Sequence, residues 1–371
     1  MIGAARARLA GGGVDFILSV AVAVIALLVA MIFVVAAGVG FGHGASAFVN
    51  GAFGTKLNIA GTLAKTVPLT LVALGWIVVF KAGRFHVGFP GQILIGGMFV
   101  SIIALKTDLP AAIHLPLAVI AGMVGGAAFA GIAAWLWAKR GVNEILSTLL
   151  LNLVAVQILA WWVRHPFHDH TTPLPITKPF PNSSRWPELL KYTDLHWDIV
   201  LVPVVAVAIS FLLARTLFGF RTRLVGAGEQ VARHAGISPE RVGTRAILLS
   251  GALAGLAGAS LVIAGSTPSM GEDFGSNYGF TGIAVALLAR NSPIASIPAA
   301  LLFAALEQGG GVMEGTVGIS SSLVDFIQGL MIVLVLAATT LLYLVRRKQQ
   351  GSRGARPRSQ ATPQAELEPA R

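Results

Sequence analysis

The chain alternates between long apolar stretches and short polar connections over most of its length. A helix needs about 20 mainly apolar residues to cross the hydrocarbon core of a bilayer. Windows of this kind occur at residues 14–40, 58–80, 88–105, 111–138, 143–163, 198–217, 244–265 and 320–345, and two shorter apolar runs occur at 280–290 and 293–308. The pattern predicts an all-α polytopic membrane protein with about ten transmembrane helices, some of them short or broken.

The first window raises the question of a signal peptide. Its apolar run is far longer than the 7–15 residues typical of a signal peptide, so we expect a retained helix. Composition supports a membrane protein, because 55% of the 371 residues are hydrophobic and only 12% are charged. The chain has no cysteine, which excludes disulfides and cysteine-ligated metals.

The distribution of basic residues predicts the orientation. The formal net charge is +11, and most of the 27 lysines and arginines lie beside the ends of predicted spans that would share the cytosolic side. Cytosolic connections of membrane proteins carry such an excess. We therefore expect a multi-pass protein of a prokaryotic plasma membrane with both termini cytosolic. The basic residues form no groove with interleaved aromatics, so we expect no nucleic-acid partner.

Residues 1–348 are predicted to form one transmembrane domain with two notable connections. The first, at 164–197, is an external loop rich in proline and histidine. His168 and His170 flank Asp169, but this spacing lacks the helical i, i+4 arrangement of common metal sites, and we expect no metal there. After the domain, residues 349–371 are poor in apolar residues and predict a disordered cytosolic tail.

The second connection, at 219–243, is the long basic stretch between spans and is predicted to be cytosolic. Its part from Phe220 to Ile237 holds several arginines against one acid, Glu229, and a short amphipathic piece. Two interpretations remain open: a docking element for a partner, or a connector whose arginines only fix topology. The candidate docking residues are Arg221, Arg223, Gly226, Glu229, Ala232, Arg233 and Gly236.

Polar residues inside the spans are candidates for a transport path, because polar groups in lipid are costly unless they face protein or water. Glu144, Ser147, Thr148 and Asn152 share one face of a predicted helix. The candidate path residues are Gln92, Asn152, Glu307 and Gln328. Helix capping, packing or interfacial exposure would equally explain such residues. Closely spaced glycines, at Gly122 to Gly126 and Gly251 to Gly255, predict close helix packing.

The sequence offers no catalytic site. It has no GxSxG or HExxH motif and no GxxxxGK[ST] phosphate loop. If the protein uses ATP, another chain must bind it. Breaks near Pro90 and Pro293 favour a transporter, since broken helices at membrane depth are tolerated where they line a cavity.

Three ordered segments carry a resemblance to a known family. They are GVNEILSTLLLN at 141–152, LVGAGEQVARHAGI at 224–237 and YGFTGIAVALLARNSP at 278–293. With the hydropathy pattern, they resemble the permease subunits of ABC importers for nucleosides and simple sugars, the type served by lipoproteins of the basic-membrane-protein family. The resemblance covers roughly residues 60–345. The family's FNIG.EGQ stretch is FHVGFPGQ here, so a role for its acid cannot be transferred.

The resemblance implies a mechanism and partners. An extracytoplasmic substrate-binding lipoprotein would deliver the solute, and separate cytosolic ATPase subunits, which hold ATP and magnesium, would drive alternating access through the segment at 220–237. A second homologous permease would complete a heterodimeric pore. This chain itself would be a transport subunit with no cofactor of its own.

Other functions remain open at this stage. A branched-chain amino-acid ABC permease is the nearest alternative. An ion-coupled secondary transporter would need no ATPase and would use a buried carboxylate, such as Glu307 or Asp325. A membrane-embedded enzyme that uses the histidine-rich loop has little support, because no acid–base set accompanies the histidines.

Overall fold

The computed structural model describes residues 40–265, 269–275 and 277–318, together with positions 32, 35, 326, 329, 330, 333, 334 and 337. The predicted first span at 14–40, the last span at 320–345 and the tail at 349–371 lie almost wholly outside these residues. So do Asp325 and the candidate path residue Gln328. The structural statements below concern the described residues.

The described chain is all-helical apart from loops and isolated β-bridges. The α-helices are α2 (Phe41–Val49), α3 (Lys56–Lys81), α4 (Phe89–Lys106), α5 (Ala111–Arg140), α6 (Glu144–Arg164), α7 (Leu201–Arg215), α8 (Leu217–Ala227), α9 (Glu229–His234), α10 (Pro239–Ile263), α11 (Tyr278–Leu288) and α12 (Ser296–Val317). A π-helical turn, η1 (Asn50–Gly54), joins α2 to α3, and short 3₁₀ turns, η2 (Asn182–Ser184) and η3 (Trp197–Val200), occur in the long loop.

Six helices within the described residues are long and apolar enough to cross a membrane: α3, α4, α5, α6, α7 with the turn before it, and α10. Each coincides with a window predicted from the sequence. The all-α polytopic class is therefore confirmed, while the total of about ten spans and the cytosolic position of both termini stay predictions.

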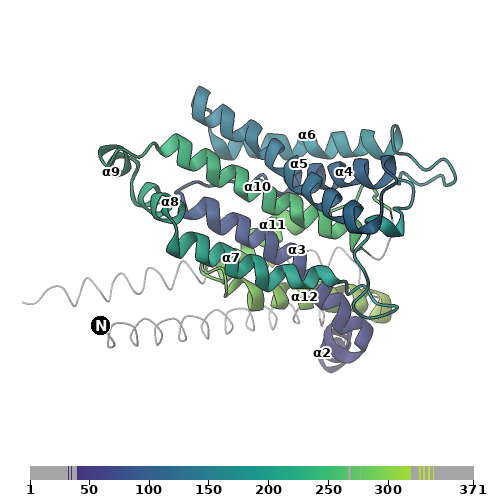
Figure 1. Cartoon of the computed structure of the whole chain (residues 1–371). Helices are drawn as coiled ribbons and strands as arrows, with labels where there is room; N and C mark the ends of the chain where they lie inside the picture. Colours follow the sequence, from purple (N-terminus) through teal and green to yellow (C-terminus); the bar gives the residue numbers. More distant parts are fainter. Residues whose placement is uncertain are drawn as a thin grey trace, which may run out of the picture.

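Helix α3 forms the centre of the described structure. Its side chains are buried from Thr66 to Val79, and they pack against α10, α11 and α12. In Figure 1, α5 and α6 lie on one side of α3 and α10, and α7 and α12 lie on the other. Helices α6 and α7 expose most of their apolar side chains, as helices that face lipid do. The core therefore sits between α3 and α10.

Glycine makes the contact between α5 and α10 unusually close. A Cβ atom added to Gly255 would lie 2.1 Å from the carbonyl oxygen of Gly122, and one added to Gly126 would lie 2.3 Å from that of Gly251. Backbones approach this closely only where side chains are absent. The packing role predicted for these glycines is confirmed.

Three elements, α12, α2 and η1, differ from the prediction. The run predicted at 293–308 is the longer helix α12, which continues through Gly309, Gly310 and Gly311 and stops at Gly318. Gly318 has a φ of 71°, the left-handed conformation that commonly ends a helix. Helix α2 and η1 lie between the windows predicted at 14–40 and 58–80 and were not predicted as helical, because their sequence mixes small, aromatic and polar residues.

The loop at 164–197 is ordered and rests on the end of α10. The backbone N–H of Trp186 donates to the carbonyl oxygen of Ile263 at 3.0 Å, and Thr177 exchanges hydrogen bonds with Met270. This loop lies at one end of the helices, and α8 and α9 lie at the other (Figure 1). We call these the loop end and the α8–α9 end.

Candidate functional site

The small residues of the predicted docking segment have structural roles at the α8–α9 end. Gly226 lies so close to the end of α3 that an added Cβ would be 2.3 Å from the carbonyl oxygen of Lys81. Ala232 is fully buried in a small apolar cluster with Val225 and Val242. Gly236, with a φ of 72°, ends α9. These residues fix α8 and α9 against the membrane helices.

The charged residues of the same segment are exposed but differ in their contacts. Glu229 forms an ion pair with Arg84, Arg233 forms one with Glu240, and Arg223 donates to the carbonyl oxygen of Leu213. Arg221 forms no hydrogen bond or ion pair within the described part of the chain. Three of these four residues therefore stabilise the end itself, and Arg221 is the one left available to a partner.

Arg84 links this segment to the membrane helices. It follows the end of α3, and its guanidinium lies 3.8 Å from the ring centroid of Trp137 near the end of α5. The same side chain pairs with Glu229 at the start of α9. Arg84 therefore connects the start of α9 to α5 beside the end of α3.

Two predicted path residues, Gln92 and Asn152, meet near the same end. Asn152 is buried, its Oδ1 accepts from the backbone N–H of Gly91 at 2.9 Å, and its Nδ2 donates to the carbonyl oxygen of Val87 at 2.9 Å. The carboxamide thus ties α6 to the loop that enters α4. Gln92 is also buried and contacts the ring of His86.

His86 occupies the position where the resembled family has asparagine. Its ring is fully buried, and its Nδ1 lies 3.3 Å from the Oε1 of Glu144 at the first turn of α6. His86, Gln92, Glu144 and Asn152 therefore form one buried polar cluster between α4 and α6. In the described structure this cluster holds a loop in place, and a role of Gln92 and Asn152 in the path stays a prediction.

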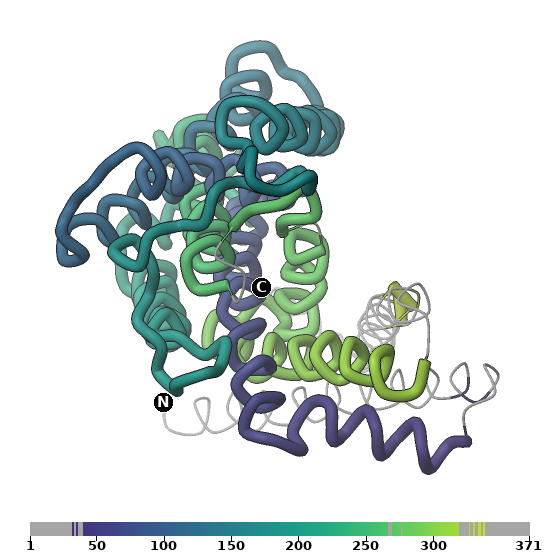
Figure 2. Tube along the Cα trace, turned by 90° about the vertical axis from the view of Figure 1, so that its right-hand side faces the viewer, coloured from purple at the N-terminus to yellow at the C-terminus, as the bar shows by residue number. Residues whose placement is uncertain are grey.

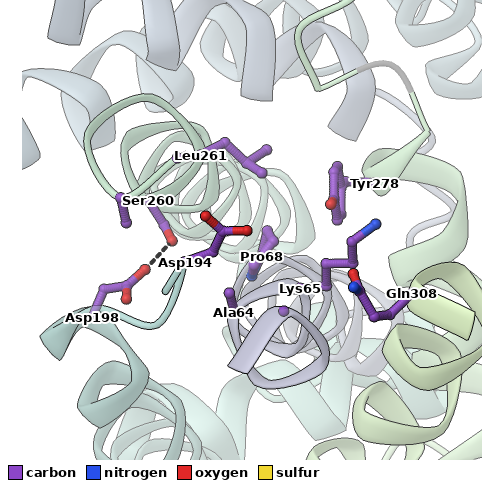
Figure 3. Close-up of a pocket in the computed structure, with 12 residues that line it drawn as sticks. Ala64, Lys65, Pro68, Asp194, Asp198, Ser260, Leu261, Tyr278 and Gln308 are labelled. Atoms are coloured by element: carbon purple, nitrogen blue, oxygen red, sulfur yellow. Dashed lines mark hydrogen bonds between the residues drawn. The ribbon is translucent and has the colours of Figure 1, made fainter. Parts of the chain in front are cut away.

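A polar cavity of about 190 Å³ lies among the helices at the loop end (Figure 3). Lys65 and Pro68 of α3, Ser260 of α10 and Tyr278 of α11 contribute to its wall. The remaining polar groups in the wall are Asp194, Asp198 and Gln308. Ser260 donates to the carboxylate of Asp198, which ties the start of α7 to α10.

The third predicted path residue, Glu307, lies beside this cavity. Its Oε1 accepts from Lys65 Nζ at 2.9 Å and from the Tyr278 hydroxyl at 3.0 Å. One carboxylate therefore joins α3, α11 and α12. The sequence singled out Glu307, but its partners lie 242 and 29 residues away along the chain, and only the fold brings them together.

The histidines of the loop at 164–197 are divided among local contacts. His168 and His170 stack edge to face with ring centroids 5.0 Å apart, whereas His196 contacts the carbonyl oxygen of Asp194. The backbone N–H and hydroxyl of Thr171 donate to Asp169 and lower the pKa of that carboxyl. Asp169 therefore stabilises a turn of the loop through these hydrogen bonds.

Comparison with known proteins was made with the whole chain. Residues 58–336 match the family described as the permease component of the branched-chain amino acid transport system. A glucose ABC transporter permease of Haloferax volcanii is 35% identical, over 76% of this chain and 77% of that protein. A guanosine ABC transporter permease of Bacillus subtilis is 29% identical, over 89% of this chain and 95% of that protein.

A nucleoside ABC transporter permease of Lactococcus lactis is 32% identical, over 70% of this chain and 73% of that protein. B. subtilis and L. lactis each have a second such permease that is also similar to this chain. The matched region includes every helix from α3 to α12 and thus both ends described above. The chain therefore belongs to this family of ABC transporter permeases.

Proposed function

We propose that this chain is the membrane permease of an ATP-driven importer for a nucleoside or a simple sugar. The observation that carries the proposal is its similarity, over about three quarters of the chain or more, to permeases named for glucose and guanosine. The family is named for branched-chain amino acid transport, but the relatives reported above favour nucleosides and sugars. The permease is a multi-pass protein of the prokaryotic plasma membrane.

The energy for import comes from a separate ATPase in this proposal. A solute can shift a conformational equilibrium only by its differential affinity for the two states, so its binding cannot drive uphill transport. The sequence has no GxxxxGK[ST] loop to bind ATP. ATP and magnesium therefore belong to a cytosolic partner, and the α8–α9 end is where we place that partner. Both termini are then cytosolic, and the loop end is external.

Two further partners complete the proposal. An extracytoplasmic lipoprotein delivers the solute to the loop end, and a second, homologous permease pairs with this one. The second permeases of B. subtilis and L. lactis support a heterodimer, since each resembles this chain.

The direct test is uptake of radiolabelled nucleosides and sugars by cells that express this chain with its genomic neighbours. A variant of the neighbouring ATPase that lacks its Walker lysine is the control. We expect that variant to abolish uptake. Uptake that survives it and collapses with a protonophore would instead establish an ion-coupled transporter. ATP-dependent uptake of leucine alone would establish the amino-acid alternative.

Docking at the α8–α9 end has its own test. Arg221→Ala should reduce co-purification of the ATPase at least tenfold and leave the thermal midpoint of the permease unchanged, because Arg221 forms no hydrogen bond or ion pair within the described chain. Arg223→Ala is the variant for comparison. It should lower the thermal midpoint of the permease as well as the co-purification of the ATPase, because Arg223 donates a hydrogen bond to the end of α7. Normal co-purification of both variants and of the triple variant that adds Arg233→Ala would refute this docking site.

A further inference from the structure

A groove of about 400 Å³ lies at the loop end between α2, η1, the start of α3 and the last turns of α12. It is separate from the cavity of Figure 3, with which it shares no lining residue. Figure 2 shows α2 and α12 running side by side at the edge of the described structure. The groove is therefore on an outer face of the described structure.

One wall of the groove is a polar face of α2 and η1. His43, Ser46 and Asn50 are separated by three and four residues, so they share one face of the helix, and all three are exposed. Asn50 Nδ2 donates to Ser46 Oγ at 3.2 Å, and Asn58 Nδ2 donates to the Asn50 carbonyl oxygen at 2.7 Å. These bonds hold the carboxamides and the hydroxyl in place. The π-helical turn at this point is a form often found at functional sites.

The neighbourhood of this polar face is apolar. Phe41, Val49 and Phe53 are exposed beside it. Polar groups of a membrane protein face protein or water rather than lipid. A surface of α6 shows the contrast, because its shallow depression is lined by Leu153, Val154, Ile158 and Trp161 with Gln157 alone as a polar member. The α2–α12 face thus differs from an ordinary lipid-facing surface.

Size and charge indicate what the groove can hold. Sites for small molecules have volumes of about 300–1,000 Å³. The groove reaches that range, as does the apolar depression on α6 at about 420 Å³, whereas the cavity of Figure 3, at about 190 Å³, does not. The polar lining, not the volume, therefore distinguishes the groove from the depression on α6. Among the described residues, no lysine, arginine, aspartate or glutamate lines the groove. Its polar groups are an imidazole, hydroxyls and carboxamides, which can donate to and accept from hydroxyl groups and base edges.

The absence of charged groups from this lining argues against an amino acid. The ammonium and carboxylate of a zwitterion lose hydration on binding and need charged or strongly oriented partners to offset that loss. A nucleoside or a sugar carries no formal charge and needs only neutral hydrogen-bonding groups. The lining therefore matches the uncharged solutes.

We propose that this groove is one wall of the solute path, with a transient binding site for an uncharged nucleoside or sugar formed around Ser46, Asn50 and Thr316. This inference rests on the proposed function, and the second permease would supply the opposite wall. A path site must bind well enough to admit the solute and weakly enough to release it. A shallow groove with neutral groups meets both needs.

The first experiment measures binding at the groove. Because the chain has no cysteine, Ser46→Cys introduces its single thiol. The assembled transporter in liposomes is labelled with a water-soluble maleimide, with or without millimolar guanosine, glucose or leucine. We expect the imported nucleoside or sugar to slow labelling at position 46 at least threefold and leucine to have no effect. Gln157→Cys on α6 is the control, and no solute should slow its labelling.

The second experiment measures transport at saturating solute. Asn50→Leu should lower uptake per ATP hydrolysed at least tenfold, Asn50→Gln should retain most of it, and Gln157→Leu should leave it unchanged. Import by the wild type with neither protection at position 46 nor an effect of Asn50→Leu would overturn the groove and leave the proposed function standing. Import of leucine alone, with protection by leucine, would overturn both.

Discussion

At the scale of single residues, Asn152 shows how one carboxamide supports a change of chain direction. Its two hydrogen bonds satisfy a backbone acceptor at Val87, in the loop before α4, and a backbone donor at Gly91, in the first turn of α4. Leaving such groups buried without partners costs about 1–3 kcal/mol in the free energy of unfolding. The residue is therefore important to the fold whether or not solute passes near it.

Replacing Asn152 by leucine should lower the thermal midpoint of the purified permease and reduce uptake, since Val87 and Gly91 at the entry to α4 lose their link to α6. The free energy of unfolding should fall by about 1–3 kcal/mol. Gln157→Leu removes an exposed carboxamide from the same helix and is the control, with no change expected. Thermal melting followed by size exclusion gives the comparison. Equal midpoints for the two variants would refute the structural role of Asn152.

A second residue-scale prediction concerns pH at the loop end. The side-chain hydrogen bonds from Arg164 lower the pKa of Glu272 below its ordinary value of 4.5. Because the folded pKa is lowered, the pair stabilises the fold above the ordinary value and is lost as the pH falls through the lowered pKa. Proteolysis of the segments around Arg164 and Glu272 should therefore accelerate as the pH falls below that ordinary value. Glu272→Gln should already show the faster rate at pH 7. An identical acid dependence in that variant would contradict the assignment.

Residue roles were predicted less well than residue positions. The sequence marked Asn152 and Glu307 as buried polar groups of interest, and both are at polar junctions of the fold. It gave no sign of Lys65 or Tyr278, because their common partner lies in a distant segment. Spacing along one helix predicts a shared face, whereas a contact between helices depends on packing that one sequence does not reveal.

At the scale of elements, hydropathy predicted the long spans and the core of two shorter helices, α11 and α12, but not α2 or η1. Windows of about 20 apolar residues identified α3 to α7 and α10, because a helix that crosses a bilayer needs an apolar run of that length. Helix α2, η1 and the second half of α12 are rich in glycine and small polar residues. Their mixed composition leaves no run of about 20 apolar residues, so a search with such windows does not identify them.

The α5–α10 contact yields a prediction at this scale. Gly255→Ala places a methyl group where the backbone of α5 already lies, so the free energy of unfolding should fall by about 1–3 kcal/mol or more. Gly315→Ala in α12 is the matched control, because nothing lies within 4 Å of the added methyl. The free energy of unfolding of this control should rise by up to about 1 kcal/mol, because alanine is more favourable than glycine within a helix. Thermal midpoints of both variants test this packing, and a stable Gly255→Ala protein would contradict it.

At the scale of the whole molecule, the charged and polar groups lie mainly at two ends of an apolar helical body. The α8–α9 end is held by ion pairs to Arg84 and Glu240, which lie on either side of the segment in sequence. The loop end is held by the carboxylate of Glu307, which joins three helices. Since α3 and α10 extend from one end to the other, a movement of α8 and α9 has a continuous route to the cavity of Figure 3.

A test at Glu307 distinguishes ion-coupled transport from transport driven by ATP hydrolysis. An ion-coupled transporter would need a carboxylate such as this one to bind and release a proton in each cycle. In the structure, Lys65 and Tyr278 both bind its Oε1, which suits a permanent link between helices. Glu307→Gln keeps the shape and an acceptor but cannot exchange a proton. We expect uptake by this variant within about threefold of the wild type, a difference of less than about 1 kcal/mol. Loss of the ATPase Walker lysine should still abolish that uptake. Loss of uptake with intact assembly and ATP hydrolysis would instead make Glu307 a coupling group.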